Sequence, residues 1–174
     1  MDTLKLYSLA FKGLKQGHHK LEYSLDKTFF DNFEHSAIHE SNIQVIINIE
    51  VSHRLLDFNY IIEGFHKSDC DRCLKNIQPK IKGEFRYLVK IVDDISENME
   101  NDDEVAYIST KESFYNYAKD MYDFIHLSMP LRNVCENETE CDLRVQELLN
   151  NYHQQSQTND SRWEKLNILK QDKN

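Results

Sequence analysis

Glycine and proline are scarce in this 174-residue sequence, which holds four glycines and two prolines. This scarcity excludes collagen-like and proline-rich proteins. Four cysteines are too few for a disulfide scaffold at this length, and they suit a reducing compartment. No stretch approaches the roughly 20 apolar residues that a membrane helix needs, and the N-terminal residues lack the apolar run of a signal peptide. We therefore expect a cytoplasmic protein that does not enter a membrane.

Basic residues are also in deficit, because 21 Lys and Arg stand against 30 Asp and Glu, for a formal net charge of −9. This balance excludes a uniformly basic surface that coats RNA. The charges are unevenly spread: residues 67–90 hold seven bases and three acids, whereas residues 93–104 hold seven acids and no base. Any contact with RNA is therefore expected to be local.

Length and composition favour one folded domain with a sizeable core, since 40% of the residues are hydrophobic. We assign residues 1–152 to a single α+β domain. Residues 153–161 are polar, include three glutamines and predict a linker. Residues 162–174 predict a short tail helix. One face of this helix carries three residues that are candidates for docking on a partner or on the chain's own core, namely Trp163, Leu166 and Leu169.

Alternating apolar and polar residues predict β-strands. The clearest run spans residues 43–51, where every second residue is Ile or Val, and a helix would scatter these side chains around its circumference. The same alternation predicts strands over residues 56–62 and 77–91, and long sequential strands with short connections form an antiparallel meander. Shorter strands are expected at residues 4–6, 21–25 and 105–109.

One main amphipathic helix is predicted after the strands, from Phe114 to Ile125, because apolar residues recur there with a helical period. A capping box at Ser109 and Glu112 would open it, and Pro130 would close it. Shorter helices are expected at residues 27–33, capped by Asp26, and at Asp142–Tyr152. The predicted fold is α+β: a predominantly antiparallel β-sheet, which could curl toward a barrel, with one main amphipathic helix and short C-terminal helices.

The four cysteines form two local pairs. Cys70 and Cys73 are separated by two residues in the turn between the second and third long strands, and the other two by five residues beyond Pro130. Thiolates bind Zn²⁺ at about 2.3 Å, and four of them complete a tetrahedral structural site. We therefore predict a structural zinc with four ligands, Cys70, Cys73, Cys135 and Cys141.

Other interpretations of the cysteines stay open. A thiol redox protein could use Cys70 and Cys73, although a redox pair normally lies at a helix N-terminus, which lowers the thiol pKa. Four thiols without a ligand could also simply pack as small apolar side chains. His66 or His126 could replace a cysteine in the ligand set. Metal analysis and thermal melting after treatment with a chelator would distinguish these interpretations.

A stripe of bases is expected on the outward face of the third long strand. The candidates for RNA contact are Lys80, Lys82, Arg86 and Lys90 on the strand, and Lys75 in the turn before it. Such bases could bind RNA phosphates, or they could keep an exposed sheet face soluble. Because no aromatic residues interleave with them, contact with the RNA backbone is favoured over base recognition. The acidic residues 93–104 favour a different partner, a basic protein.

The sequence also resembles a known family. The segments IEGFHKSDCDRCL, HLSMPLRNVC and RWEKLNIL are similar to the YceD family of bacterial and plastid proteins, which is linked to accumulation of 23S ribosomal RNA. The resemblance runs from about Leu4 to Leu169, and Gly64 and Pro130 are among its most specific positions. It implies a nonenzymatic factor in large ribosomal subunit biogenesis that binds precursor rRNA or a large-subunit ribosomal protein.

Catalytic motifs are not evident, since the sequence has no phosphate-binding glycine loop and no nucleophile elbow. We therefore do not expect an enzyme. The main alternative to a ribosome-biogenesis factor is a zinc-stabilised protein-interaction module without RNA contact.

Overall fold

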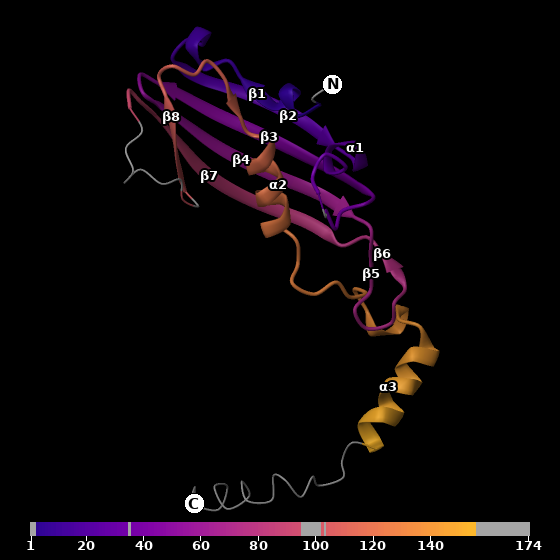
Figure 1. Cartoon of the computed structure of the whole chain (residues 1–174). Coiled ribbons are helices and arrows are strands. Elements are labelled where there is room, and N and C mark those ends of the chain that lie inside the picture. Colours follow the sequence, from indigo (N-terminus) through magenta and orange to yellow (C-terminus); the bar gives the residue numbers. More distant parts are fainter. Residues whose placement is uncertain (1–2, 35, 95–101, 103, 156–174) are drawn as a thin grey trace, which may run out of the picture. The chain divides into compact units, whose positions relative to one another are not determined.

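Two compact units make up the chain. The larger unit comprises the chain up to Ser68 together with Asn76–Asn133, and the smaller unit comprises Asp69–Lys75 together with the chain from Val134 onward. The smaller unit is therefore built from two segments that are far apart in the sequence. The computed structural model in Figure 1 describes residues 3–34, 36–94, 102 and 104–155.

A five-stranded sheet forms the larger unit, with the strand order β2-β3-β4-β7-β8. The strands are β2 Gly17–Leu25, β3 Ser41–Ser52, β4 Leu55–His66, β7 Lys80–Val92 and β8 Val105–Ser109. Neighbouring strands from β2 to β7 run antiparallel, and β8 runs parallel to β7. The predicted α+β fold with a mostly antiparallel sheet is confirmed. Among the described residues β2 and β8 are edge strands, so the sheet stays open and is not a barrel.

One face of this sheet carries the core. Every second residue of β3 from Ile43 to Val51 is buried, as predicted, and the register with β4 turns the alternating apolar residues of both strands to the same face. The helix α2 (Ala118–Leu127) lies across this face in Figure 1 and adds Met121 and Ile125 to the core. The buried residues of β4 are Leu56, Phe58, Tyr60, Ile62 and His66.

The main helix begins later than predicted. It starts at Ala118 rather than Phe114, and the predicted capping box at Ser109 and Glu112 is wrong. Ser109 ends β8 instead, and its hydroxyl accepts a hydrogen bond from the N–H of Lys111. A turn therefore follows β8, because the serine side chain satisfies a turn donor rather than a helix donor.

The segment before α2 pairs with the N-terminal part of the chain. β9 (Tyr115–Asn116) and β1 (Ser8–Leu9) form a two-stranded antiparallel sheet. The Asn116 side chain then accepts a hydrogen bond from the N–H of Ala118, at the start of α2. Pairing with residues more than a hundred positions away in the sequence therefore decides where this helix begins.

Short helices surround the sheet. The strand predicted at residues 4–6 is wrong, because Thr3–Tyr7 form the 3₁₀-helix η1; a second 3₁₀-helix, η2, spans Phe11–Gly13. Two alternating leucines are too few to distinguish a strand from a 3₁₀ turn. The helix α1 (Lys27–Phe30) is shorter than predicted, and the Asp26 carboxylate caps its first turn as expected.

The first segment of the smaller unit, Asp69–Lys75, is the turn of a hairpin. β5 (Ser68–Asp69) and β6 (Asn76–Ile77) pair with each other and enclose this turn, which holds the first two cysteines. Its second segment contains the 3₁₀-helix η3 (Glu138–Glu140) and the helix α3 (Leu143–Gln155). The two cysteine pairs of the sequence thus lie in the two segments of this unit.

The helix α3 confirms the helix predicted at Asp142–Tyr152, and it continues to Gln155, into the predicted linker 153–161. The rest of that linker and the predicted tail helix 162–174 lie outside the described residues, as do residues 95–101 and 103 of the acidic segment 93–104. Within the described residues, no helix has the length and apolar character needed to span a bilayer.

Candidate metal centre

A tight turn positions the first cysteine pair. The N–H of Cys70 donates to the carbonyl of Lys75 at 2.8 Å, and the N–H of Leu74 donates to the carbonyl of Cys70 at 2.8 Å. Leu74 closes the turn with a φ of 59°, in the left-handed region. The two hydrogen bonds bend the chain back on itself, so that Cys70 and Cys73 sit on the same loop with both side chains buried.

The left-handed backbone at Leu74 allows a test of this turn. The left-handed conformation costs an L-residue with a side chain about 1–2 kcal/mol, and glycine avoids this cost. Glycine loses more backbone entropy on folding, which offsets part of the gain. Leu74→Gly should therefore raise the free energy of unfolding by about 0.5–1 kcal/mol. The Leu74 side chain is exposed, so little packing is lost. Thermal melting of the metal-loaded chain measures the change. Leu74→Ala is the control, because it removes the side chain but keeps the backbone cost; equal melting of both variants would contradict the assignment.

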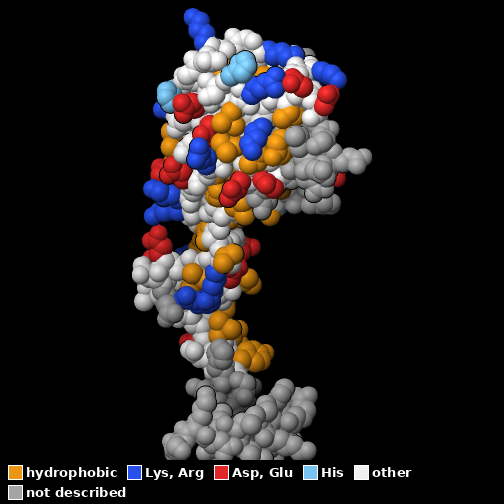
Figure 2. Space-filling model, turned by 90° about the vertical axis from the view of Figure 1, so that its left-hand side faces the viewer, with side chains coloured by type: hydrophobic (Ala, Val, Ile, Leu, Met, Phe, Trp, Pro, Cys, Tyr) orange, Lys and Arg blue, Asp and Glu red, His pale blue; other side chains and the backbone are white. Residues whose placement is uncertain are grey.

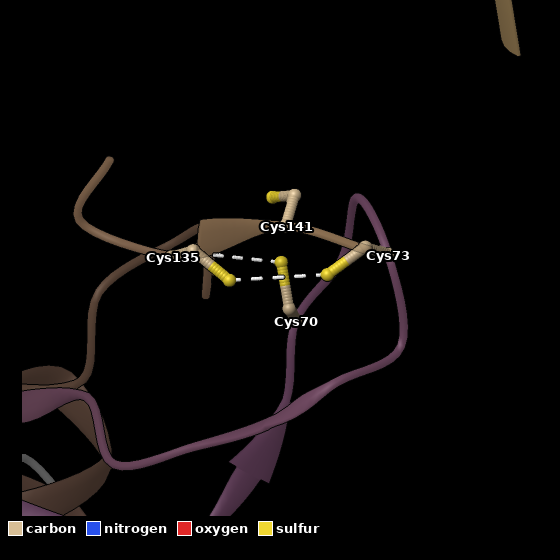
Figure 3. Close-up of side chains that lie close together, drawn as sticks. All are labelled: Cys70, Cys73, Cys135 and Cys141. Carbon is tan, nitrogen blue, oxygen red and sulfur yellow. Dashed lines mark hydrogen bonds between the residues drawn. The ribbon is translucent and has the colours of Figure 1, made fainter. Parts of the chain in front are cut away.

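The second segment of the smaller unit brings its two cysteines to the first pair. All four thiols are buried and free of disulfides, and their sulfur atoms lie within 4.8 Å of one another. Figure 3 shows the four side chains converging from two stretches of the chain. The Sγ atoms of Cys73 and Cys135 are 3.8 Å apart. Four sulfurs at about 2.3 Å from one ion at tetrahedral angles are about 3.8 Å apart, so the cluster fits a tetrahedral metal.

Hydrogen bonds make the sulfur atoms of this cluster unequal. Burial alone raises the pKa of the Cys70 thiol, but backbone N–H groups of Arg72, Cys135 and Cys73 outweigh burial and lower that pKa from 9.0 to about 6. One of these donors, the N–H of Cys135, lies 3.4 Å from the Cys70 sulfur. Burial raises the pKa of Cys135 to about 12 and also raises the pKa of Cys141. The cluster therefore stabilises one thiolate by itself, and a cation would stabilise the others.

The histidines proposed as alternative ligands are not part of this cluster. Among the described residues, the only group of His, Cys, Asp and Glu close enough to share one ion consists of the four cysteines. His66 and His126 both belong to the larger unit. His66 is buried at the end of β4, and desolvation lowers its pKa below 6.5.

The bases proposed to contact RNA lie in two units. Lys75 belongs to the smaller unit, where its ammonium donates to the carbonyl of Glu140 at 3.3 Å and so joins the two segments of that unit. The other four are exposed on β7, on the face of the sheet opposite the core, as the alternation predicted. We call this set the basic stripe: Lys80, Lys82, Arg86 and Lys90.

Neighbouring strands supply partners to much of the basic stripe. Ion pairs and ring contacts join Arg86 to Asp57 at 2.7 Å, Lys82 to Glu63 at 3.0 Å, and Lys90 to the Tyr107 ring at 5.5 Å. Both carboxylates come from β4, which the register places beside β7. On the side of the molecule that Figure 2 shows, basic and acidic side chains are intermixed. The stripe is therefore less positive than its sequence indicates.

One candidate functional residue was not predicted from the sequence. Asp120 on α2 is largely buried, and its Oδ2 accepts hydrogen bonds from the hydroxyls of Tyr115 at 2.7 Å and Tyr60 at 3.2 Å. Desolvation raises the pKa of this carboxyl above its usual value of 3.8. The three residues come from different elements, so no local motif marks them. The only signal in the sequence is an acid beside the apolar stripe of a helix.

Comparison with known proteins identifies the family. Residues 58–170 match the family described as "Large ribosomal RNA subunit accumulation protein YceD". No curated protein and no solved structure matches the chain. The matched region covers well over half of the chain and includes all four cysteines, most of β4, and the whole of β7 and α2. On this match, the chain belongs to the YceD family of large ribosomal RNA subunit accumulation proteins.

Proposed function

We propose that this protein is a nonenzymatic factor in biogenesis of the large ribosomal subunit, which supports accumulation of 23S rRNA. The observation that carries the proposal is the family match over residues 58–170. The proposal includes contact with precursor rRNA or with a large-subunit ribosomal protein. It assigns no residue to catalysis.

A structural zinc ion is the second part of the proposal, with Cys70, Cys73, Cys135 and Cys141 as ligands. Four buried sulfur donors within 4.8 Å of one another support this assignment, because soft thiolates favour zinc. Four protein ligands leave no open position for substrate, so the ion would join two chain segments rather than catalyse a reaction. Burial of all four thiols also argues against the redox alternative, which needs an accessible thiolate.

A second candidate function is a zinc-stabilised protein-interaction module without RNA contact. The ion pairs of the basic stripe favour it, since Arg86 and Lys82 already have carboxylate partners on β4. Phosphate binding would have to compete with these pairs.

The proposed role is tested by deleting the gene in its host. Mature 23S rRNA and large subunits are expected to fall while 16S rRNA stays constant, and the wild-type gene should restore both. Ribosome profiles and rRNA blots measure the effect. Normal 23S rRNA in the deletion strain would contradict the proposal.

Direct RNA contact has its own test. The purified chain and a variant with all four bases of the basic stripe changed to Gln are mixed with precursor 23S fragments at increasing salt. If RNA is the ligand, the wild type binds in a salt-sensitive manner and the variant loses this binding. Equal binding of both proteins would exclude the stripe, and no binding of either would favour the protein-interaction candidate.

A further inference from the structure

A cavity of about 500 Å³ opens in the larger unit between α2 and β8. Its apolar wall comes from both elements and includes Ala106, Ile108 and Leu127, the last of which is 70% exposed. Such a volume lies within the range of sites that bind a small molecule or a side chain with its neighbours. The cavity is unrelated to the cysteine cluster, which belongs to the smaller unit.

The described residues that line this cavity carry more acidic than basic groups. Among them are three carboxylates, from Asp102, Asp120 and Asp123, and one ammonium, from Lys119. Lys119 approaches Asp123 at 3.9 Å, and both side chains are at least half exposed, so this pair is weak and easily displaced. The cavity therefore disfavours phosphate and favours a cation.

Aromatic groups hold the deepest of these carboxylates in place. The hydroxyls of Tyr60 and Tyr115 both donate to Oδ2 of Asp120, which fixes the orientation of the carboxylate. Tyr87, Tyr107 and Phe124 are also among the residues that line the cavity. A carboxylate held in a fixed orientation attracts an organic cation through charge-assisted hydrogen bonds.

A metal ion does not fit the same groups. Within the described part of the chain, the three carboxylates do not converge closely enough to share one ion. A guanidinium suits the arrangement better, because it is planar, weakly hydrated and has five N–H donors, enough to bind two carboxylates at once. Its alkyl stem would pack on the apolar wall that ends at Leu127.

We propose that the cavity between α2 and β8 binds an arginine side chain of a basic protein partner, with Asp120 and Asp123 as acceptors. The identity of this partner as a large-subunit ribosomal protein rests on the proposed function. The evidence for the site itself is the cavity, its carboxylates and its apolar wall.

The test uses the full chain and two blocked peptides that differ in one residue, a central arginine or its neutral isostere citrulline, flanked by leucines. NMR titration should show that the arginine peptide shifts the resonances of β8 and α2, and that citrulline weakens binding about tenfold or more. Asp123→Lys should weaken binding of the arginine peptide by at least about tenfold as well. Asp123 is half exposed, so this substitution should leave the fold intact.

Glu34→Lys is the matched control, since it makes the same charge reversal at an exposed position that does not line the cavity. It should bind the arginine peptide as the wild type does. Leu127→Ser provides a second variant at the rim, with weaker binding expected from loss of apolar contact. Three outcomes would overturn the proposal. They are equal binding of the two peptides, undiminished binding of the arginine peptide by Asp123→Lys, and resonance shifts confined to strands other than β8.

The two proposals fail in different experiments. If the deletion strain has normal 23S rRNA, the proposed function is wrong, but the peptide titration still tests the cavity. If the deletion lowers 23S rRNA and the arginine peptide does not bind, only the cavity inference is wrong. Binding of a precursor 23S fragment at these same resonances would also overturn it, because an acidic cavity should repel phosphate.

Discussion

Removing the proposed zinc ion from the four-cysteine cluster is expected to unfold the smaller unit while leaving the larger unit folded. The physical reason is that, among the described residues of the smaller unit, the buried side chains are the four cysteines themselves. Its large apolar residues, such as Leu143 and Tyr152, are exposed. A unit with so small an apolar core would depend on the proposed metal, since structural zinc contributes about 10 kcal/mol or more in small zinc-dependent domains.

The expected signal is loss of α3. An isolated helix of 13 residues is marginal in water, so α3 should lose helicity once its segment is released from the hairpin turn. Metal analysis should find one zinc per chain, and a strong chelator should remove it with a fall in helical circular dichroism. The sheet of the larger unit should persist, because it has a core of its own.

A single ligand change should have the same effect. Cys135→Ser is expected to abolish stoichiometric zinc binding and to reproduce the circular dichroism of the chelated wild type. Leu74→Ala is the matched control, because Leu74 adjoins Cys73 but is exposed and offers no ligand. Full zinc occupancy in Cys135→Ser, or unchanged helicity after zinc removal, would contradict the structural role of the metal.

Gly64→Ala is expected to destabilise the larger unit by about 3 kcal/mol, at the upper end of the cost of overpacking. A Cβ at this position would lie 2.3 Å from the carbonyl oxygen of Asn42 and 2.7 Å from the Cα of Ile43. Both are backbone atoms of β3, which pairs with β4 at this point. They cannot rotate away as a side chain would, so the two central strands must separate locally.

Urea unfolding followed by circular dichroism measures this loss. Gly13→Ala is the control, because a Cβ there meets nothing within 4 Å. The control should unfold within about 0.5 kcal/mol of the wild type. If both variants unfold at the same urea concentration, the close approach of β3 to Gly64 is not the reason for glycine at that position.

The long strands could be predicted from the sequence, because the alternation of apolar and polar residues is a local pattern. In β3 and β4 each apolar residue is followed by one that faces the opposite side, so the sequence identifies the strands and their buried faces without knowledge of their neighbours. The main helix shows the limit of such reasoning. Its apolar period identified the helix, but pairing of β9 with β1 moved its start to Ala118.

The basic stripe shows a second limit. Alternation along β7 correctly predicted that Lys82 and Arg86 lie on one exposed face, because the direction of alternate side chains depends on one strand alone. Their counter-charges, Glu63 and Asp57, lie on β4 and reach them only through the register between the two strands. A charge count along the chain therefore overstates the positive charge of this surface.

The cysteine cluster shows most clearly which features the sequence determines and which the tertiary structure decides. The sequence by itself determined that two pairs exist and that each is close enough along the chain for two thiolates to face one ion, since a spacing of two to five residues keeps them on one loop. Only the tertiary structure decided that Cys73 meets Cys135, 62 residues later, at 3.8 Å between sulfur atoms. The physical reason is that closing so long a loop depends on β7, β8 and α2, which fold between the pairs, and not on the residues next to either cysteine.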